Sequence, residues 1–167
     1  MKTKQNYLKV ALLLTAFTLL PSAQPAMAKD QVPFKGIEVG ATSDGGFDFP
    51  FATILDTSEG EATHLGHFTK TGIILIDVIS MTVTGIFTLT AANGDELFLI
   101  GTGDASPPSI HQETVLKVTV TGGTGRFNGA TGDWTEVSDF AFPFGETSVD
   151  PYAATLEGAI STPGANK

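Results

Sequence analysis

The chain contains no cysteine, few basic residues and none of the common hydrolase or nucleotide-binding motifs. Without cysteine there can be no disulfide, thiol nucleophile or thiolate metal ligand, so stability must come from burial and hydrogen bonding. G-x-S-x-G, the phosphate-binding glycine loop and H-E-x-x-H are also missing. A hydrolytic triad, a nucleotide site and a zinc-binding helix therefore have no support in the sequence.

Residues 1–28 have the pattern of a secretory signal peptide. Three lysines precede the apolar run Val10–Leu20, and the small-residue site Ala26-Met27-Ala28 follows. The alternative, an uncleaved anchor, is disfavoured because this run is shorter than the roughly 20 residues that a spanning helix needs. We expect cleavage after Ala28 and a periplasmic or extracellular product.

Residues 29–167 are long enough for a single domain with one core. Three of the nine basic residues lie within residues 1–28, so six remain against all 18 acidic ones, a formal charge of 6 − 18 = −12. Such a charge repels nucleic acid and anionic lipid headgroups. We expect no nucleic-acid partner, and no motif indicates a cofactor.

Alternating apolar and polar residues, the pattern of strands with one wet face, recur along most of the mature chain. In Met81–Thr90, for example, Val83, Gly85, Phe87 and Leu89 share one face. Asn93-Gly94 between two such runs is a strong hairpin signal. The predicted strands are Val32–Thr42, Phe47–Leu55, Ala62–Thr69, Gly72–Ile79, Met81–Ala91, Glu96–Gly101, Thr114–Thr121, Asp133–Phe140 and Tyr152–Ser161.

Helical apolar spacing is absent after residue 28, so the fold is predicted to be all-β, a barrel or a sandwich of eight or nine strands. The wet faces carry too much Thr, Glu and Lys for a lipid-facing belt, which argues against membrane insertion. Ile73–Ile76 and Leu97–Ile100 are apolar at every position. Strands of this kind are typically covered on both faces, and we expect a homo-oligomer contact or a crossing loop there.

Two patches repeat the pattern F-x-F-P-F. They supply six candidate ligand-binding residues: Phe47, Phe49, Phe51, Phe140, Phe142 and Phe144. One interpretation is a pair of aromatic lips at the mouth of a barrel that binds a small lipophilic or aromatic molecule. The alternative, favoured because Phe is so commonly buried, is that these rings fill the core or a subunit interface.

No metal site is predicted. His64 and His67 lie three positions apart, so on one strand they point to opposite faces and could not reach one ion without a bulge at Gly66. Asp56, Glu59 and Glu61 match no calcium-binding loop and are expected in a solvated loop.

Asp77 and Glu113 are the candidate general acids or bases. Asp77 has apolar neighbours, so its pKa would rise if it pointed into a barrel. The outward or interface orientation, in which it protects an edge strand, is slightly favoured.

The segment Gly122–Gly132, GGTGRFNGATG, contains five glycines around the step Arg126-Phe127 and predicts a turn at a sheet corner. It resembles the G-G-T-G-x-F-x-x-A-x-G stretch of the allene oxide cyclase and dirigent barrels. The stretch Ala62–Thr69, ATHLGHFT, more loosely resembles a strand of small exported bacterial members of this group, which implies that His64 is a packed, hydrogen-bonded strand residue. Arg126 either binds a ligand carboxylate or, as we favour, fixes this turn against a carboxylate such as Asp133.

This resemblance implies a single eight-stranded antiparallel β-barrel over residues 29–167, a trimer, and an apolar lumen that confines a reactive small molecule. The catalytic residues of those families have no counterpart that can be placed on this chain. We therefore expect a lipophile-binding or structural protein, with a cyclase, isomerase or dirigent-type enzyme as the alternative.

Overall fold

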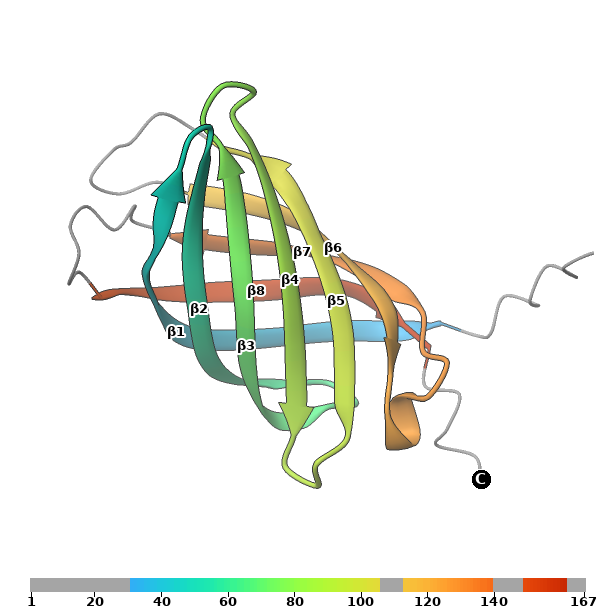
Figure 1. Cartoon of the computed structure of the whole chain (residues 1–167). Helices are drawn as coiled ribbons and strands as arrows, with labels where there is room; N and C mark the ends of the chain where they lie inside the picture. The colour runs from blue at the N-terminus through green and yellow to red at the C-terminus, as the bar shows by residue number, and fades with distance from the viewer. Residues whose placement is uncertain (1–30, 106–112, 140–148, 162–167) are drawn as a thin grey trace, which may run out of the picture.

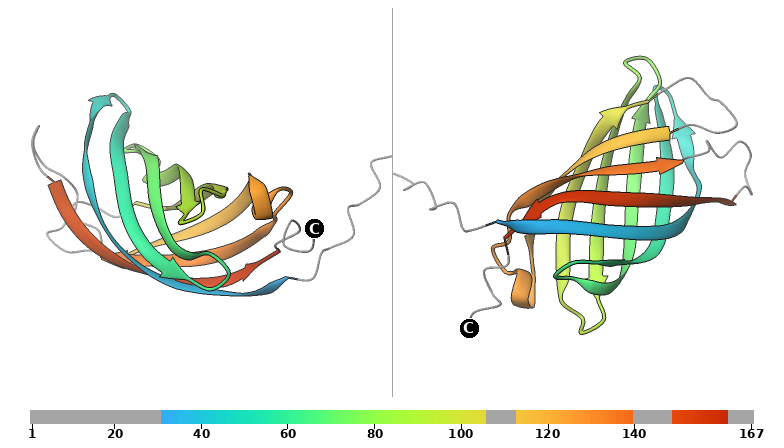
Figure 2. Two further views of the ribbon diagram at one scale, coloured as in Figure 1. Left: turned by 90° about the horizontal axis from the view of Figure 1, so that it is seen from below. Right: turned by 180° about the vertical axis from the view of Figure 1, so that it is seen from behind.

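The computed structural model describes residues 31–105, 113–139 and 149–161. Within them the chain forms one closed antiparallel barrel, in which each strand pairs with the next and β8 returns to pair with β1 (Figures 1 and 2). The strands are β1 (Val32–Asp48), β2 (Phe51–Ala62), β3 (Gly66–Asp77), β4 (Thr82–Ala91), β5 (Glu96–Asp104), β6 (Glu113–Gly123), β7 (Gly132–Asp139) and β8 (Val149–Ile160). A short 3-10 helix, η1 (Gly125–Phe127), lies between β6 and β7.

The eight-stranded barrel predicted from the sequence is confirmed. In β4 the predicted inward face, Val83, Gly85, Phe87 and Leu89, is buried, and the Asn93-Gly94 turn joins β4 to β5. Gly94 has a φ of 86°, which explains why a glycine occupies this turn. No helix in the described ranges is long and apolar enough to span a bilayer.

The prediction of separate strands over residues 62–69 and 72–79 is wrong. Residues 66–77 form one strand, and the turn lies at residues 63–65. The reason is backbone geometry: His64 and Gly66 have φ values of 66° and 73°, which end β2 and reverse the chain. His64 is consequently an exposed turn residue and not a packed strand residue.

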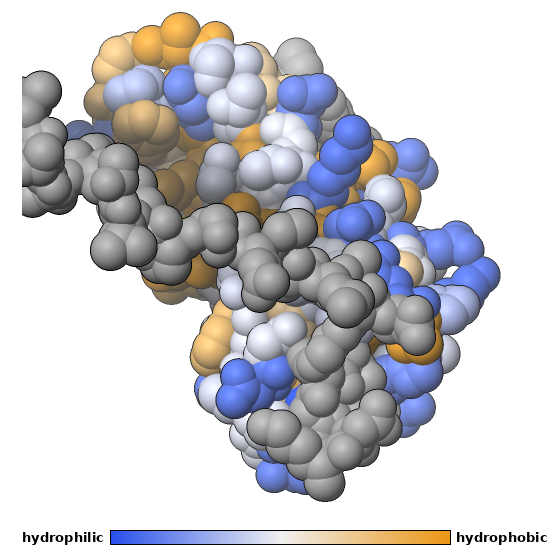
Figure 3. Space-filling view, turned by 90° about the vertical axis from the view of Figure 1, so that its right-hand side faces the viewer, coloured by the Kyte–Doolittle hydropathy of each residue, from blue (hydrophilic) through white to orange (hydrophobic). Residues whose placement is uncertain are grey.

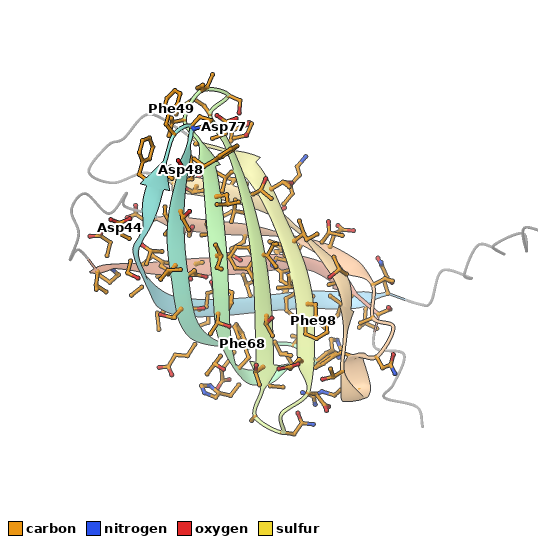
Figure 4. All side chains as sticks on the ribbon, viewed as in Figure 1. Asp44, Asp48, Phe49, Phe68, Asp77 and Phe98 are labelled. Carbon is orange, nitrogen blue, oxygen red and sulfur yellow. The ribbon has the colours of Figure 1, made fainter. Side chains whose placement is uncertain are left out.

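The barrel has two ends, which we call the upper and lower ends after their places in Figure 1. The β1–β2 and β3–β4 turns lie at the upper end, where Figure 4 labels Phe49 and Asp77. The lower end is plugged by apolar side chains, all buried: Phe34, Leu65, Phe127, Ala130, Trp134 and Ile160. The Phe34 and Trp134 rings lie 4.6 Å apart between centroids. These side chains close the lower end of the barrel.

Candidate functional site

Above the apolar plug, the lumen contains a buried cluster of charged side chains centred on Lys70 of β3. The Lys70 ammonium donates hydrogen bonds to Glu38 Oε1 of β1 and, at 3.1 Å, to Glu136 Oε1 of β7. It also lies 3.4 Å from Asp56 Oδ2 of β2. The four side chains are at most 6% exposed, so one ammonium and three carboxylates share an interior from which water is largely excluded.

Tyr152 of β8 completes this cluster. Its hydroxyl donates to Asp56 Oδ1 at 2.7 Å and lies 3.2 Å from Glu38 Oε1. The ring passes close to Gly40, where a methyl group would lie 2.8 Å from the ring carbon Cε1. Glycine at position 40 is therefore what allows the tyrosine ring to lie against the β1 wall and bring its hydroxyl to the carboxylates.

Burial and mutual charge perturb the protonation of the cluster. Burial raises the pKa of Glu38 to about 7, against the lowering effect of Lys70. Burial acts to lower the pKa of Lys70, but Glu136, Glu38 and Asp56 together raise it well above 10.5. Burial, as the largest effect, also raises the pKa of the Tyr152 hydroxyl above its usual 10. Near neutral pH the cluster thus contains a charged lysine, a neutral tyrosine and a Glu38 that gains or loses a proton.

Several buried oxygens around this cluster have no hydrogen-bond partner within the described part of the chain. They are Glu38 Oε2, Thr42 Oγ1, Ser58 Oγ, Asp150 Oδ2 and Asp56 Oδ2, the last of which still lies within ion-pair distance of Lys70. The strand register brings them together, because Thr42 faces both Asp56 and Asp150, and Gly40 faces Ser58. We call this surface, on β8, β1 and β2, the polar wall. Buried polar atoms are normally paired, so a concentration of unpaired ones in one place needs an explanation.

The opposite side of the lumen is apolar, and we call it the apolar wall: Val83, Phe87, Leu89, Leu99, Leu116 and Val118 of β4 to β6. Phe87 lies flat on three glycines, since a methyl group at Gly72 or Gly85 would collide with its ring and one at Gly101 would lie 3.0 Å from it. The Lys70 ammonium lies 5.1 Å from the centre of this ring and 5.6 Å from that of Tyr152. The lumen is therefore amphipathic, with the lysine between its two walls.

Most of this site was not predicted, and one of its residues was misassigned. Asp56 was expected in a solvated acidic loop with Glu59 and Glu61, but all three lie within β2. Asp56 faces inward in phase with Ile54, whereas Glu59 and Glu61 face outward. One sequence feature could have predicted this site: a charged residue at a position that alternation places on the apolar face of a strand. Lys70 shares the face of Phe68 and Ile74 in this way.

The predicted phenylalanine lips are described only in part. Phe47, Phe49 and Phe51 lie around the β1–β2 turn at the upper end, with Phe49 labelled in Figure 4. All three are exposed, and the Phe47 and Phe49 rings are edge to face at 6.4 Å. Figure 3 shows hydrophobic side chains gathered at this end of the molecule. Phe140, Phe142 and Phe144 lie outside the described residues. Ligand contact by these rings stays a prediction.

The two predicted acid–base candidates lie away from the cluster. Asp77 is at the upper end of β3, where it accepts hydrogen bonds from the backbone N–H groups of Ile79 and Ser80. These bonds lower its pKa, the opposite of what an inward, desolvated carboxyl would show. Glu113 is an exposed residue at the start of β6. The structure does not bring either residue to Lys70, and their catalytic role is untested.

Arg126 fixes the η1 turn at the lower end, but its partner is not Asp133. The guanidinium donates to the Leu65 carbonyl at 2.9 Å, and its Nε lies 3.7 Å from Asp95 Oδ2. The Asp95 carboxylate also accepts the Arg126 backbone N–H. Asp133 is exposed on β7, where it pairs in register with Thr119 and Ala159 of the neighbouring strands. The carboxylate that holds Arg126 is therefore Asp95 of the β4–β5 turn. No group of three or more histidine or acidic side chains in the described ranges is arranged to hold a metal ion.

Two shallow grooves lie on the outer surface of the described strands. One, of about 450 Å³, is lined by residues of β1, β2, β3, β7 and β8 that include Ile37, Val39 and His67. The other, of about 410 Å³, lies over β3 and β4 around Ile73, Leu75 and Ile86. Both face outward and neither is lined by the buried ammonium of Lys70.

A scan against models of known protein families finds no match to this chain, and a search of curated proteins likewise finds none.

Proposed function

We propose that this protein is an exported binding barrel that holds one small amphipathic molecule in its lumen. The observation that carries the proposal is the group of unpartnered oxygens on the polar wall, opposite the apolar wall. An unpaired polar group in an apolar interior costs about 1–3 kcal/mol, and a ligand that donates to it removes that cost. Eight-stranded barrels are of a size that can enclose one small ligand.

The polar wall gives this ligand an orientation. Its head group would lie among Glu38, Thr42 and Ser58, and its apolar body would lie against Phe87. Since the lower end is plugged, the ligand would enter at the upper end, beside the exposed Phe47 and Phe49. The phenylalanine lips would then contact the ligand while it enters the barrel and not after it has bound.

A matched pair of variants on β2 tests this proposal. Ser58→Val places a branched apolar side chain on the polar wall, whereas Thr57→Val makes a similar change on the outer face of the same strand. Phenylalkyl compounds would be titrated by calorimetry, with the fluorescence of the single tryptophan, Trp134, as a second readout. We expect Ser58→Val to abolish binding and Thr57→Val to leave it unchanged. Binding that survives Ser58→Val, or no binding to the wild type, would refute a lumen site.

We further propose that the chain is a distant member of the allene oxide cyclase and dirigent-like group of barrels. The resembling segment Gly122–Gly132 spans the end of β6, η1 and the start of β7. In this segment Phe127 and Ala130 are buried in the lower plug. The motif thus supports the fold at the lower end, away from Lys70, and it carries no information about the ligand.

A structural role as a symmetric oligomer is a second candidate, supported by the outer face of β2 to β5 at the front of Figure 1. Leu55, Ile73, Ile86 and Ile100 stand directly opposite one another in register and are all exposed. The two neighbouring rows are also uncharged: Thr53, Leu75, Thr84 and Thr102 on one side, and Thr57, Thr71, Thr88 and Phe98 on the other.

On a chain with a formal charge of −9, an uncharged apolar strip is the surface on which two copies repel each other least. Ile86→Glu should therefore yield a monomer in sedimentation equilibrium. Ile37→Glu is the matched control, because Ile37 on β1 is exposed to the same 66% as Ile86. A wild type that is already monomeric at tens of micromolar would rule out this role.

A further inference from the structure

The charges buried in the lumen do not balance. Among the described residues, the buried charged side chains are Lys70 and the three acidic residues Glu38, Asp56 and Glu136. Even with one proton on Glu38, the carboxylates exceed the ammonium by one charge. An uncompensated charge in a low-dielectric interior is costly, which favours the entry of a compensating cation.

The unpartnered atoms of the polar wall are also mostly acceptors. Glu38 Oε2 and Asp150 Oδ2 are carboxylate oxygens, and the Thr42 and Ser58 hydroxyls can accept as well as donate. The ammonium of Lys70, the strongest donor nearby, is already directed at Glu38, Glu136 and Asp56. A ligand carboxylate would find no free cation in this cluster, and it would meet the acidic side chains that surround Lys70.

The apolar wall suits a cation next to it. The Phe87 and Tyr152 rings each lie within 6 Å of the Lys70 ammonium, which shows that their faces accommodate positive charge at this level of the lumen. A second ammonium group would thus have the carboxylate oxygens and the Tyr152 ring of the polar wall on one side and the Phe87 face on the other.

We infer that the molecule held in this lumen is an apolar amine, whose protonated head group binds Glu38 Oε2 and the neighbouring oxygens of the polar wall. This inference rests on the proposed lumen site. It excludes fatty acids and other lipophilic carboxylates as preferred ligands, although these are equally apolar.

The test compares three probes of equal length: 4-phenylbutylamine, 4-phenylbutanol and 4-phenylbutyrate. Charge-assisted hydrogen bonds are about twice as strong as neutral ones, so the amine should bind about tenfold more tightly than the alcohol, and the carboxylate should bind most weakly. Calorimetry on the wild-type protein gives all three affinities without any substitution. Equal affinity of amine and alcohol, or tighter binding of the carboxylate, would overturn the amine assignment and leave the lumen site standing. Failure of all three to bind would overturn the lumen site itself.

Glu38→Gln locates the head group. It preserves the side-chain shape and removes the charge, so affinity for the amine should fall about tenfold while affinity for the alcohol stays the same. Glu59→Gln is the control, because Glu59 is an exposed carboxylate on the outer face of β2. Asp56→Asn is the second variant should Glu38→Gln fail to fold. An equal loss for amine and alcohol in a folded variant would contradict a charge-specific contact.

Discussion

Glu38 makes the stability of this barrel depend on pH in an unusual direction. Its carboxyl has a pKa of about 7 in the folded protein against 4.5 for an unperturbed glutamate, chiefly because burial disfavours the charged form. The folded state therefore retains a proton that the unfolded chain has lost between about pH 4.5 and 7. Stability is greatest below this range and falls as pH rises through it, because the unfolded state binds fewer protons there.

The magnitude follows from the two pKa values. A tenfold difference in proton affinity corresponds to about 1.4 kcal/mol, so the step from 4.5 to about 7 corresponds to about 3 kcal/mol of stability lost by about pH 8. Asp77, Asp95 and Glu157 have lowered pKa values, so their contributions vary with pH below this range. The change in stability between about pH 5 and 8 is therefore assigned to Glu38.

Glu38→Gln is the decisive perturbation, because the amide resembles the neutral acid and does not ionise. Urea unfolding of wild type and variant would be followed by Trp134 fluorescence at about pH 5 and at about pH 8. We expect similar stability at the lower pH, and at the higher pH a variant about 3 kcal/mol more stable than the wild type. Glu59→Gln should leave the pH dependence unchanged. A wild type whose stability rises from about pH 5 to 8, or a Glu38→Gln variant with the same pH profile as the wild type, would refute the reasoning.

Three further predictions concern the cluster and the walls around it. Lys70→Met should cost about 3–5 kcal/mol in urea unfolding, since it leaves three buried carboxylates without their cation, whereas Lys117→Met on the exposed face of β6 should have little effect. Gly72→Ala should cost about 1–3 kcal/mol because its methyl group collides with Phe87, and Phe87→Leu in the same chain should recover part of that loss; additive effects would show that the two do not touch. Arg126→Lys should lower the melting temperature through loss of the hydrogen bond to Leu65, worth about 1 kcal/mol, and an unchanged melting temperature would count against a structural role.

The fold was predictable because apolar and polar residues alternate along the strands. Val83, Phe87 and Leu89 repeat with period two, and Asn93-Gly94 marks a turn that only certain residues can form. The β2–β3 turn was misplaced because its left-handed residues are a histidine, His64, and one glycine, Gly66, in a stretch without proline. Local sequence gives little warning that a histidine will adopt such a backbone conformation.

The site was harder to predict because polar residues occupy inward positions there. Asp56 and Lys70 lie in phase with Ile54 and Phe68, yet a charged residue inside a strand is normally read as facing solvent. Their burial is tolerable only because β1, β2, β3 and β7 bring opposite charges together around one point. That pairing depends on barrel closure and on the strand register, which no single segment of the sequence specifies.

A crystal structure of the protein grown with 4-phenylbutylamine would test the central claim most directly. We predict the ammonium within about 3 Å of Glu38 Oε2, the usual length of a charge-assisted hydrogen bond, and the phenyl ring against Phe87. An amine bound only in the outer grooves, or a lumen in which the side chains of the two walls pack against each other without it, would contradict the account.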